Sequence, residues 1–363
     1  MVALGGGHGL YSSLSALRLL DTDITAVVTV ADDGGSSGRI RRELGVLPPG
    51  DLRMALAALA SNSFGPAGVG SSAGVSSSAG VGSSAGVGSS AGVGGPASVG
   101  APVSWSTVLQ HRLGGTGALA GHPIGNLLLT GLMELHSDSV TALDELARLV
   151  GAHGRVLPMS QQPLDLIAEV ASVDPDDPVQ LRRIRGQSAI AATAGRVTSI
   201  QLVPAEAPAC SQAVQAILHA DVVILGPGSW FTSVIPHLLV PGLAAALTLT
   251  AAKRIIILNL EQQAGETEGF SPEEHLRALR EHCPRLKVDV VIADTDAVLD
   301  PRGLRRYTDS AGSRLVLTPV AAVGDAARHD PGKLSLAVAD AAGLNIDDNG
   351  DGLQRRGTEQ GVR

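Results

Sequence analysis

Four loops hold the glycines and polar side chains of this sequence that could do chemistry, and each follows a short apolar run. The first, GGGHG at residues 5–9, precedes a segment with the leucine spacing of a helix. Glycine lets backbone amides approach a phosphate closely, and the helix would add partial positive charge. The dinucleotide pattern G-x-G-x-x-G fits imperfectly, because Leu10 takes its last position. The loop predicts a phosphate cradle, or else a ligand-free turn, built from Gly5, Gly6, Gly7 and Gly9.

The second loop, DDGGSSGR at residues 32–39, combines two carboxylates with glycines and hydroxyls. Asp32 suits a ribose hydroxyl, whereas Asp32 and Asp33 together suit Mg²⁺ held through substrate phosphates. The groups that suit a phosphate belong to Gly34, Gly35, Ser36 and Ser37. A capped surface loop is the alternative. Residues 34–38 also match the hydrolase pattern G-x-S-x-G, which recurs between residues 70 and 92 and therefore has little value here.

The third loop, GPGS at residues 226–229, directly follows the apolar run Val222–Leu225. A glycine turn with hydroxyls on the next helical turn is typical of an anion cradle. The alternative is a strand-to-helix turn that binds nothing. The residues expected to contact a ligand are Gly226, Gly228, Ser229 and Thr232.

The fourth loop runs from Glu261 to Phe270 and is acidic and glycine-containing. At a ligand-binding edge such a loop indicates a mobile substrate loop with Phe270 as a ligand contact, and a solvated loop is the alternative. Aromatic side chains adjoin three of the four loops and either stack on a nucleotide base or fill the core. They are Tyr11, Trp230, Phe231 and Phe270.

Two predicted helix starts add polar side chains. Asp51, which follows two prolines and a glycine, is expected to cap a helix with Arg53 in its first turn. His122 precedes a second apolar helix that places Asn126 among the candidate ligand contacts. Capping alone explains Asp51, but Asp33 and Asp51 are also the candidate catalytic groups and metal ligands.

Short β-branched runs alternate with helical spacing along the chain, which predicts the elements that must position these loops. The runs are Ile24–Val30, Val222–Leu225, Ile255–Leu260, Val288–Ile292 and Leu315–Val320. Apolar strands alternating with helices predict an α/β, Rossmann-like fold, with a mostly parallel sheet and helices on both faces. The loops would then share the ligand-binding edge at the carboxyl ends of the strands. The first strand, Met1–Leu4, is short, which suggests that residues are missing upstream.

Composition excludes several classes of function. Net charge is −8 and aromatic residues make up 2%, which argues against a nucleic-acid-binding protein. The sequence has two cysteines, no CxxC, no G-x-x-x-x-G-K-[ST], and no apolar stretch long enough to span a membrane. We expect a cytoplasmic protein without a membrane span.

Two segments fall outside the predicted domain. Residues 65–103 contain only Gly, Ala, Ser, Val and Pro and cannot bury enough surface to order, so a flexible insertion is predicted. Residues 346–363 are expected to form a disordered tail. The remainder, residues 1–345, is predicted to be a single CofD-like α/β domain.

Several longer stretches resemble the gluconeogenesis factor family, a branch of the 2-phospho-L-lactate transferase (CofD) superfamily. They include GGGHGL from Gly5, ADDGGSSGRIRRELGVLPPGDLR from Ala31, AGHPIGNLLL from Ala120, GPGSWFTSVIPHLLVPG from Gly226 and GETEGF from Gly265. The resemblance implies a Rossmann-like fold, a cytoplasmic location and a UDP-sugar ligand such as UDP-N-acetylglucosamine. It also implies a link to growth on gluconeogenic carbon sources, cell shape and envelope synthesis. Transferase relatives use Mg²⁺ and a nucleotide-activated phospholactyl donor.

The sequence departs from the family at two candidate positions. His8 stands where many relatives have Thr, and Phe270 stands where many have Tyr, so a hydroxyl contact from that position is lost. The resemblance favours a UDP-sugar-binding regulatory protein over a Mg²⁺-dependent transferase that uses Asp33 and Asp51. A dinucleotide oxidoreductase is disfavoured by Leu10. The expected partners are a UDP-sugar or related nucleotide and further copies of the chain, with Mg²⁺ as the possible cofactor.

Overall fold

The computed structural model describes residues 1–60, 103–171, 180–193, 195–263, 265–345 and 354–355. The predicted insertion lies outside these residues except for Val103, and the predicted tail except for Gln354–Arg355. The division into one domain with an insertion and a tail therefore stays a prediction.

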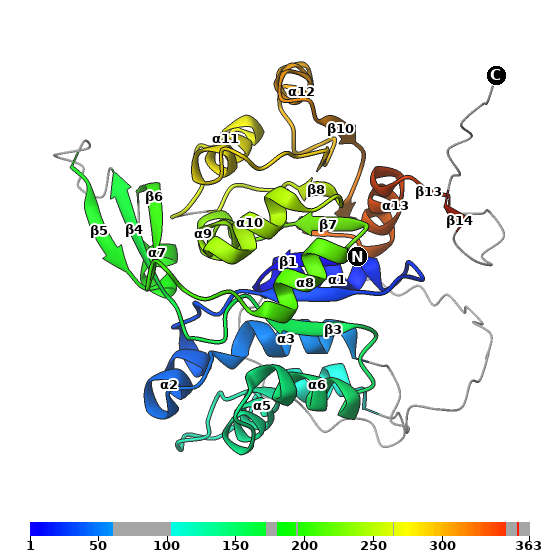
Figure 1. Cartoon of the computed structure of the whole chain (residues 1–363). Coiled ribbons are helices and arrows are strands. Elements are labelled where there is room, and N and C mark those ends of the chain that lie inside the picture. The colour runs from blue at the N-terminus through cyan, green and yellow to red at the C-terminus, as the bar shows by residue number, and fades with distance from the viewer. Residues whose placement is uncertain (61–102, 172–179, 194, 264, 346–353, 356–363) are drawn as a thin grey trace, which may run out of the picture.

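A parallel sheet of seven strands forms the centre of the molecule, in the order β10-β9-β8-β7-β1-β2-β3 (Figure 1). Its strands are short and mostly buried, as expected for a sheet covered on both faces. β1 is as long as its neighbours β2 and β7. The strands are β1 Val2–Gly5, β2 Thr25–Val28, β3 Arg155–Pro158, β7 Val222–Leu225, β8 Lys253–Ile257, β9 Val290–Ala293 and β10 Arg314–Leu317.

Helices cover both faces of this sheet (Figure 1), which confirms the predicted Rossmann-like α/β class. Those packed together on one face are α1 Gly7–Leu17, α3 Pro49–Leu59 and α13 Pro331–Ala342. Those on the other are α8 Ser211–His219, α9 Pro236–Leu239 and α10 Pro241–Leu249. The order of the strands reverses between β1 and β7, and this switch point is where ligands bind in open α/β sheets.

Smaller elements surround the central sheet. An antiparallel sheet is formed by β4 Asp165–Ala171, β5 Arg182–Arg185 and β6 Arg196–Val203. Two-stranded pairs are β11 Ala321–Ala322 with β12 Asp325–His329, and β13 Leu344–Asn345 with β14 Gln354–Arg355. The other helices are α2 Gly35–Leu44, α4 Trp105–Gln110, α5 Ile124–Leu135, α6 Ser139–Leu149, α7 Gln187–Ala192, the π-helix η1 Trp230–Val234, α11 Pro272–His282 and α12 Pro301–Ser310.

The start of α3 corrects one prediction. Asp51 does not cap this helix, because α3 begins at Pro49 and Pro48 takes the capping position. Proline fixes φ for the first helical position, and a residue before proline is restricted to extended backbone. The two consecutive prolines therefore start the helix two residues before Asp51, which becomes the third helical residue.

Within the described residues, no single helix is long and apolar enough to cross a membrane. The segments Trp230–Leu239 and Pro241–Leu249 meet that test only as a pair, bent by 80°.

Candidate functional site

The first and third loops lie in contact at the switch point. Gly9 carries no side chain, and a Cβ there would lie 2.2 Å from the Pro227 carbonyl oxygen and 2.4 Å from Gly228 Cα. Only glycine allows the two backbones to come this close. Two turns that are more than 200 residues apart in sequence are therefore joined at one edge of the sheet, as the parallel strands predict.

The first loop continues β1 into α1, and the start of α1 is open. Gly5 is the last residue of β1, Gly6 precedes the helix, and Gly7 has φ of +54°. The residue before α1, Gly6, has no side chain to cap the helix, and the first turn contains no acidic residue. The amides of His8 and Gly9 thus remain suited to an anion.

Asp51 lies directly beneath this first loop. A Cβ on Gly6 would be 2.5 Å from Asp51 Oδ2, and the Gly7 amide hydrogen-bonds the carboxylate. Burial, followed by the charge of Asp32, raises the pKa of Asp51 to about 7. Asp51 Oδ2 and the nearby Thr29 Oγ1 are buried without a hydrogen-bond partner. The first loop therefore covers a carboxyl group with unused bonding capacity.

The second loop meets the same region through Asp32 and Ser37. A Cβ on Gly50, in the first turn of α3, would lie 2.3 Å from Ser37 Oγ and 2.7 Å from Asp32 Oδ2. Burial raises the pKa of Asp32 above its usual range. Gly34 precedes α2 and donates to Asp32 Oδ1 at 2.9 Å, while Gly35 is the first residue of α2. Asp32 and Asp51 are thus two partly desolvated carboxyl groups at adjacent helix starts.

Asp33 has a different position from the one expected for a metal ligand beside Asp51. Its Oδ1 accepts the Ser188 amide at 2.8 Å, and a Cβ on Gly186 would lie 2.1 Å from its Oδ2. The carboxylate thereby caps α7, which is 155 residues away in sequence. Asp32, rather than Asp33, is the carboxylate whose charge acts on Asp51.

A buried chain of hydrogen bonds links four polar side chains. Arg53 Nε donates to Asn126 Oδ1 at 2.9 Å, and Asn126 Nδ2 donates to Ser36 Oγ at 3.0 Å. Ser36 Oγ also contacts His122 Nδ1 at 2.8 Å. Burial is the main cause that lowers the pKa of Arg53 to about 10 and that of His122 below its usual range. Asn126 is bonded at both ends, so its first role is to orient Arg53 and Ser36.

The third loop differs from the first because other side chains occupy its amides. Gly226 forms a cis peptide with Pro227, and the Gly228 amide donates to Asn259 Oδ1 at 2.8 Å. The Trp230 amide contacts Gln263 Oε1 at 3.3 Å. Glu266 accepts the hydroxyls of Ser229 and Thr232 together with the Phe231 amide. No local pattern in the sequence pointed to Asn259, Gln263 or Glu266 as partners of this loop.

The fourth loop supplies these partners, and its central side chains do not face solvent. Glu266 is 3% exposed and Thr267 is fully buried. Thr267 Oγ1 accepts the Gln263 amide at 3.0 Å, which holds the turn together. The solvated-loop interpretation is therefore wrong for Glu266 and Thr267, while the mobility of the loop stays a prediction.

The aromatic residues divide between core and cavity. Trp230 and Phe231 are 0% and 2% exposed, and Trp230 Nε1 donates to the His275 carbonyl at 2.9 Å. They fill the core and cannot stack on a base. Phe270 is also buried, with its ring edge against Phe231 and the Arg196 guanidinium 4.8 Å above its centre. Tyr11 lines a cavity.

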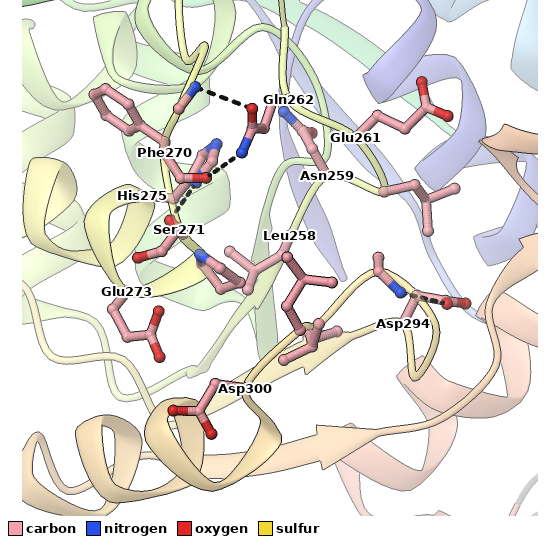
Figure 2. A pocket seen from close by; sticks show the side chains of 17 residues that line it. Leu258, Asn259, Glu261, Gln262, Phe270, Ser271, Glu273, His275, Asp294 and Asp300 are labelled. Atoms are coloured by element: carbon pink, nitrogen blue, oxygen red, sulfur yellow. Dashed lines mark hydrogen bonds between the residues drawn. The ribbon is translucent and has the colours of Figure 1, made fainter.

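That cavity, of about 530 Å³, lies where the first and third loops meet. His8, Gly9 and Gly228 line it, together with residues 259–263 and part of β12. A second cavity of about 520 Å³ lies at the ends of β8 and β9, where Leu258 and Phe270 lie near Glu273 and Asp300 (Figure 2). Residues 259–262 line both, so they form a wall between two adjoining chambers.

Comparisons with known proteins identify the family of this chain. The family profile of 2-phospho-L-lactate transferase CofD matches residues 1–324. The chain belongs to the CofD family. This CofD-family chain is 52% identical over 338 residues to a protein of Mycobacterium tuberculosis named putative gluconeogenesis factor, covering 92% of this chain and 88% of that protein.

This CofD-family chain is also similar to a second curated relative and to a solved structure. A gluconeogenesis factor of Halalkalibacterium halodurans is 32% identical over 300 residues, covering 83% of this chain and 79% of that protein. The crystal structure of a UPF0052 family member from Bacillus halodurans aligns with a TM-score of 0.73 at 29% identity. This alignment covers 93% of this chain and 97% of that one.

The described residues contain no group of three or more His, Cys, Asp or Glu side chains that could hold a metal ion. Mg²⁺ commonly uses only one or two carboxylates, with water and ligand phosphates completing its coordination. Asp51, with its unpartnered oxygen, and the nearby Asp32 fit that minimal set. Bound there with a ligand, Mg²⁺ would neutralise phosphate charge.

Proposed function

We propose that this CofD-family chain is a cytoplasmic regulatory protein that binds a UDP-sugar of the UDP-N-acetylglucosamine type. Its role would lie in gluconeogenic growth, cell shape and envelope synthesis. The observation that carries the proposal is the start of α1, where His8 and Gly9 line a cavity at the switch point of the sheet and Gly6 supplies no capping side chain. Backbone amides at such a helix start suit a diphosphate.

The two chambers suit the two ends of such a ligand. The first holds the amides of His8 and Gly9 and is the natural place for the diphosphate and sugar. The second combines apolar surface from Leu258 and Val298 with the carboxylates of Glu273 and Asp300, and no described lysine or arginine lines it. This lining disfavours phosphate and suits the N–H donors of a base. Each chamber falls within the usual size of ligand pockets.

Calorimetric titration of the purified chain with UDP-N-acetylglucosamine tests the proposal directly. We expect saturable one-to-one binding with micromolar affinity, stronger than for adenosine diphosphate or for free N-acetylglucosamine. Native mass spectrometry of freshly purified protein supplies an independent readout, because a retained UDP-sugar would appear as a fixed mass increment. Absence of saturable binding with and without Mg²⁺ would contradict the proposal.

A second candidate function is a Mg²⁺-dependent transfer of a phospholactyl group, which the surroundings of Asp51 favour. A buried carboxyl group with a pKa of about 7 can take up or release a proton near neutral pH. Product formation from a phospholactyl-nucleotide and a deazaflavin, abolished in Asp51→Asn, would support this activity. If no product forms while UDP-N-acetylglucosamine binds, the regulatory function is favoured.

A further inference from the structure

The carboxylate of Glu266 is buried beneath the third loop and is fully hydrogen-bonded. Its Oε1 accepts from Ser229 Oγ and, at 2.9 Å, from Thr232 Oγ1. Its Oε2 accepts the Phe231 amide at 3.2 Å. The two hydroxyls also contact each other. We refer to Ser229, Thr232 and Glu266 as the Glu266 triad.

The triad keeps both hydroxyl protons for itself. Three oxygen–oxygen contacts share two protons, and an ionised carboxylate can only accept. Either both hydroxyls donate to Glu266, or one donates to the other, which then donates to Glu266. In each arrangement no proton is left for a ligand. Thr232 is 1% exposed, whereas Ser229 is partly exposed and follows Gly228, which lines the first cavity. Ser229 is therefore the hydroxyl that could meet a ligand, and it can offer only lone pairs, the opposite of what a phosphate requires.

The negative charge of Glu266 also disfavours a phosphate at the third loop. In the described part of the chain its partners are hydroxyls and an amide, and no lysine or arginine forms an ion pair with it. Gly228, which lines the first cavity, directly precedes Ser229 of the triad. A buried negative charge next to the residues that line the cavity is weakly screened by solvent and repels an anion.

We infer that Glu266 determines the specificity of the proposed ligand site by making the third loop an acceptor surface. This inference rests on the proposed function and narrows it. The diphosphate binds at the first loop, whose amides are open, and the neutral sugar lies against the third loop, where its hydroxyl and amide protons can be accepted. A nucleoside diphosphate whose terminal phosphate must take that place is disfavoured.

The test compares the wild-type chain with Glu266→Gln by calorimetric titration with UDP-N-acetylglucosamine, UDP and inorganic pyrophosphate. Glutamine keeps the shape, removes the charge and donates through its amide, which frees one hydroxyl proton of the triad for another acceptor. We expect the affinity for pyrophosphate and for UDP to rise about tenfold, and the preference for the UDP-sugar over UDP to fall. Glu268→Gln is the matched control, because Glu268 is exposed in the same loop and takes no part in the hydrogen bonds of the Glu266 triad.

Ser229→Ala keeps the test decisive if Glu266→Gln folds poorly. It removes one acceptor but leaves the carboxylate in place, so the affinity for the UDP-sugar should fall about fivefold with pyrophosphate binding unchanged. Loss of pyrophosphate affinity in Ser229→Ala would overturn the inference, because Ser229 would then be a phosphate donor. A folded Glu266→Gln variant whose pyrophosphate affinity stays within twofold of wild type would also overturn it.

The outcomes separate this inference from the proposed function. If the wild-type chain binds no UDP-sugar but Glu266→Gln gains pyrophosphate binding, the proposed ligand is wrong while the polarity of the third loop is supported. If the UDP-sugar binds and the variants do not change selectivity, the function is supported and the role of Glu266 is rejected.

Discussion

Two glycine turns meet at the switch point of the sheet, and each has a buried carboxyl group beneath it. Under the first turn, Asp51 holds the Gly7 amide and leaves Oδ2 without a partner. Under the other turn, the third loop at residues 226–229, both oxygens of Glu266 accept hydrogen bonds. Similar local sequences thus give one turn above a carboxyl group with an unpartnered oxygen and one above a fully hydrogen-bonded carboxylate. The first turn remains the proposed anion site because of the His8 and Gly9 amides, not because of Asp51.

The difference arises outside the turns themselves. The first turn leads into α1, where Gly6 has no side chain to cap the helix. In the third loop and the turn that follows it, side chains from residues 259–266 accept the backbone amides. Backbone amides at the start of a helix can be satisfied either by an acceptor within the protein or by a ligand. An internal acceptor therefore competes with a ligand for the same amides. Four substitutions test this comparison.

The largest expected effect is that of Asp51→Asn on the pH dependence of the unfolding free energy. Because burial raises the pKa of Asp51 in the folded chain to about 7, the unfolded chain releases the proton first, and stability falls as pH rises from about 4 to about 7. The full difference corresponds to about 4 kcal/mol of unfolding free energy, as an order of magnitude. Asp51→Asn should remove this dependence in urea unfolding between pH 4.5 and 8. An unchanged pH slope would show that Asp51 ionises normally.

Gly228→Asp tests the first cavity, which lies where the two turns meet. A carboxylate there would face the cavity near the first turn, and UDP-sugar affinity should fall about 100-fold. Gly312→Asp is the control, because Gly312 also has positive φ but lies in open space after α12. Because φ is +138° at Gly228 and +75° at Gly312, Asp is more strained at Gly228, and the folded fraction of each variant is measured first. A loss of affinity confined to folded Gly228→Asp then identifies the ligand site by calorimetry. Equal affinities would remove Gly228 from it.

Gly9→Ala tests the contact between the turns. Its Cβ would collide with Pro227 and Gly228, so the turns must separate at a cost of about 2 kcal/mol in unfolding free energy. Gly117→Ala, which has open space around it, should be nearly neutral in the same urea titration. Equal stabilities for the two variants would mean that the close approach of the turns is not required.

Asp33→Ala has the smallest expected effect and separates capping from metal binding. Loss of the bond to the Ser188 amide should lower the free energy of unfolding by about 1 kcal/mol. Mg²⁺-dependent ligand affinity should remain unchanged if Asp51 and Asp32 are the relevant carboxylates. If the Mg²⁺ dependence is lost in this variant, the original assignment of Asp33 as a metal ligand is supported.

Much of the fold was predictable because its signals are local. The run Val222–Leu225 is β7 without change. The convergence of the glycine loops also followed, because parallel strands place their carboxyl ends at one edge. The cap of α3 was misplaced by three residues, at Asp51 instead of Pro48, since the effect of the two prolines on the helix start was underestimated.

The sequence by itself determined the strands, the helix starts and the glycine turns, because periodicity, proline and glycine act through neighbouring residues. Only the tertiary structure decided which turn stays open, which carboxylate loses its solvent and which caps a distant helix. Asp33 with Ser188 and Ser229 with Glu266 are 155 and 37 residues apart. Hydrogen bonds of that kind depend on how packed elements meet, and no local pattern encodes them.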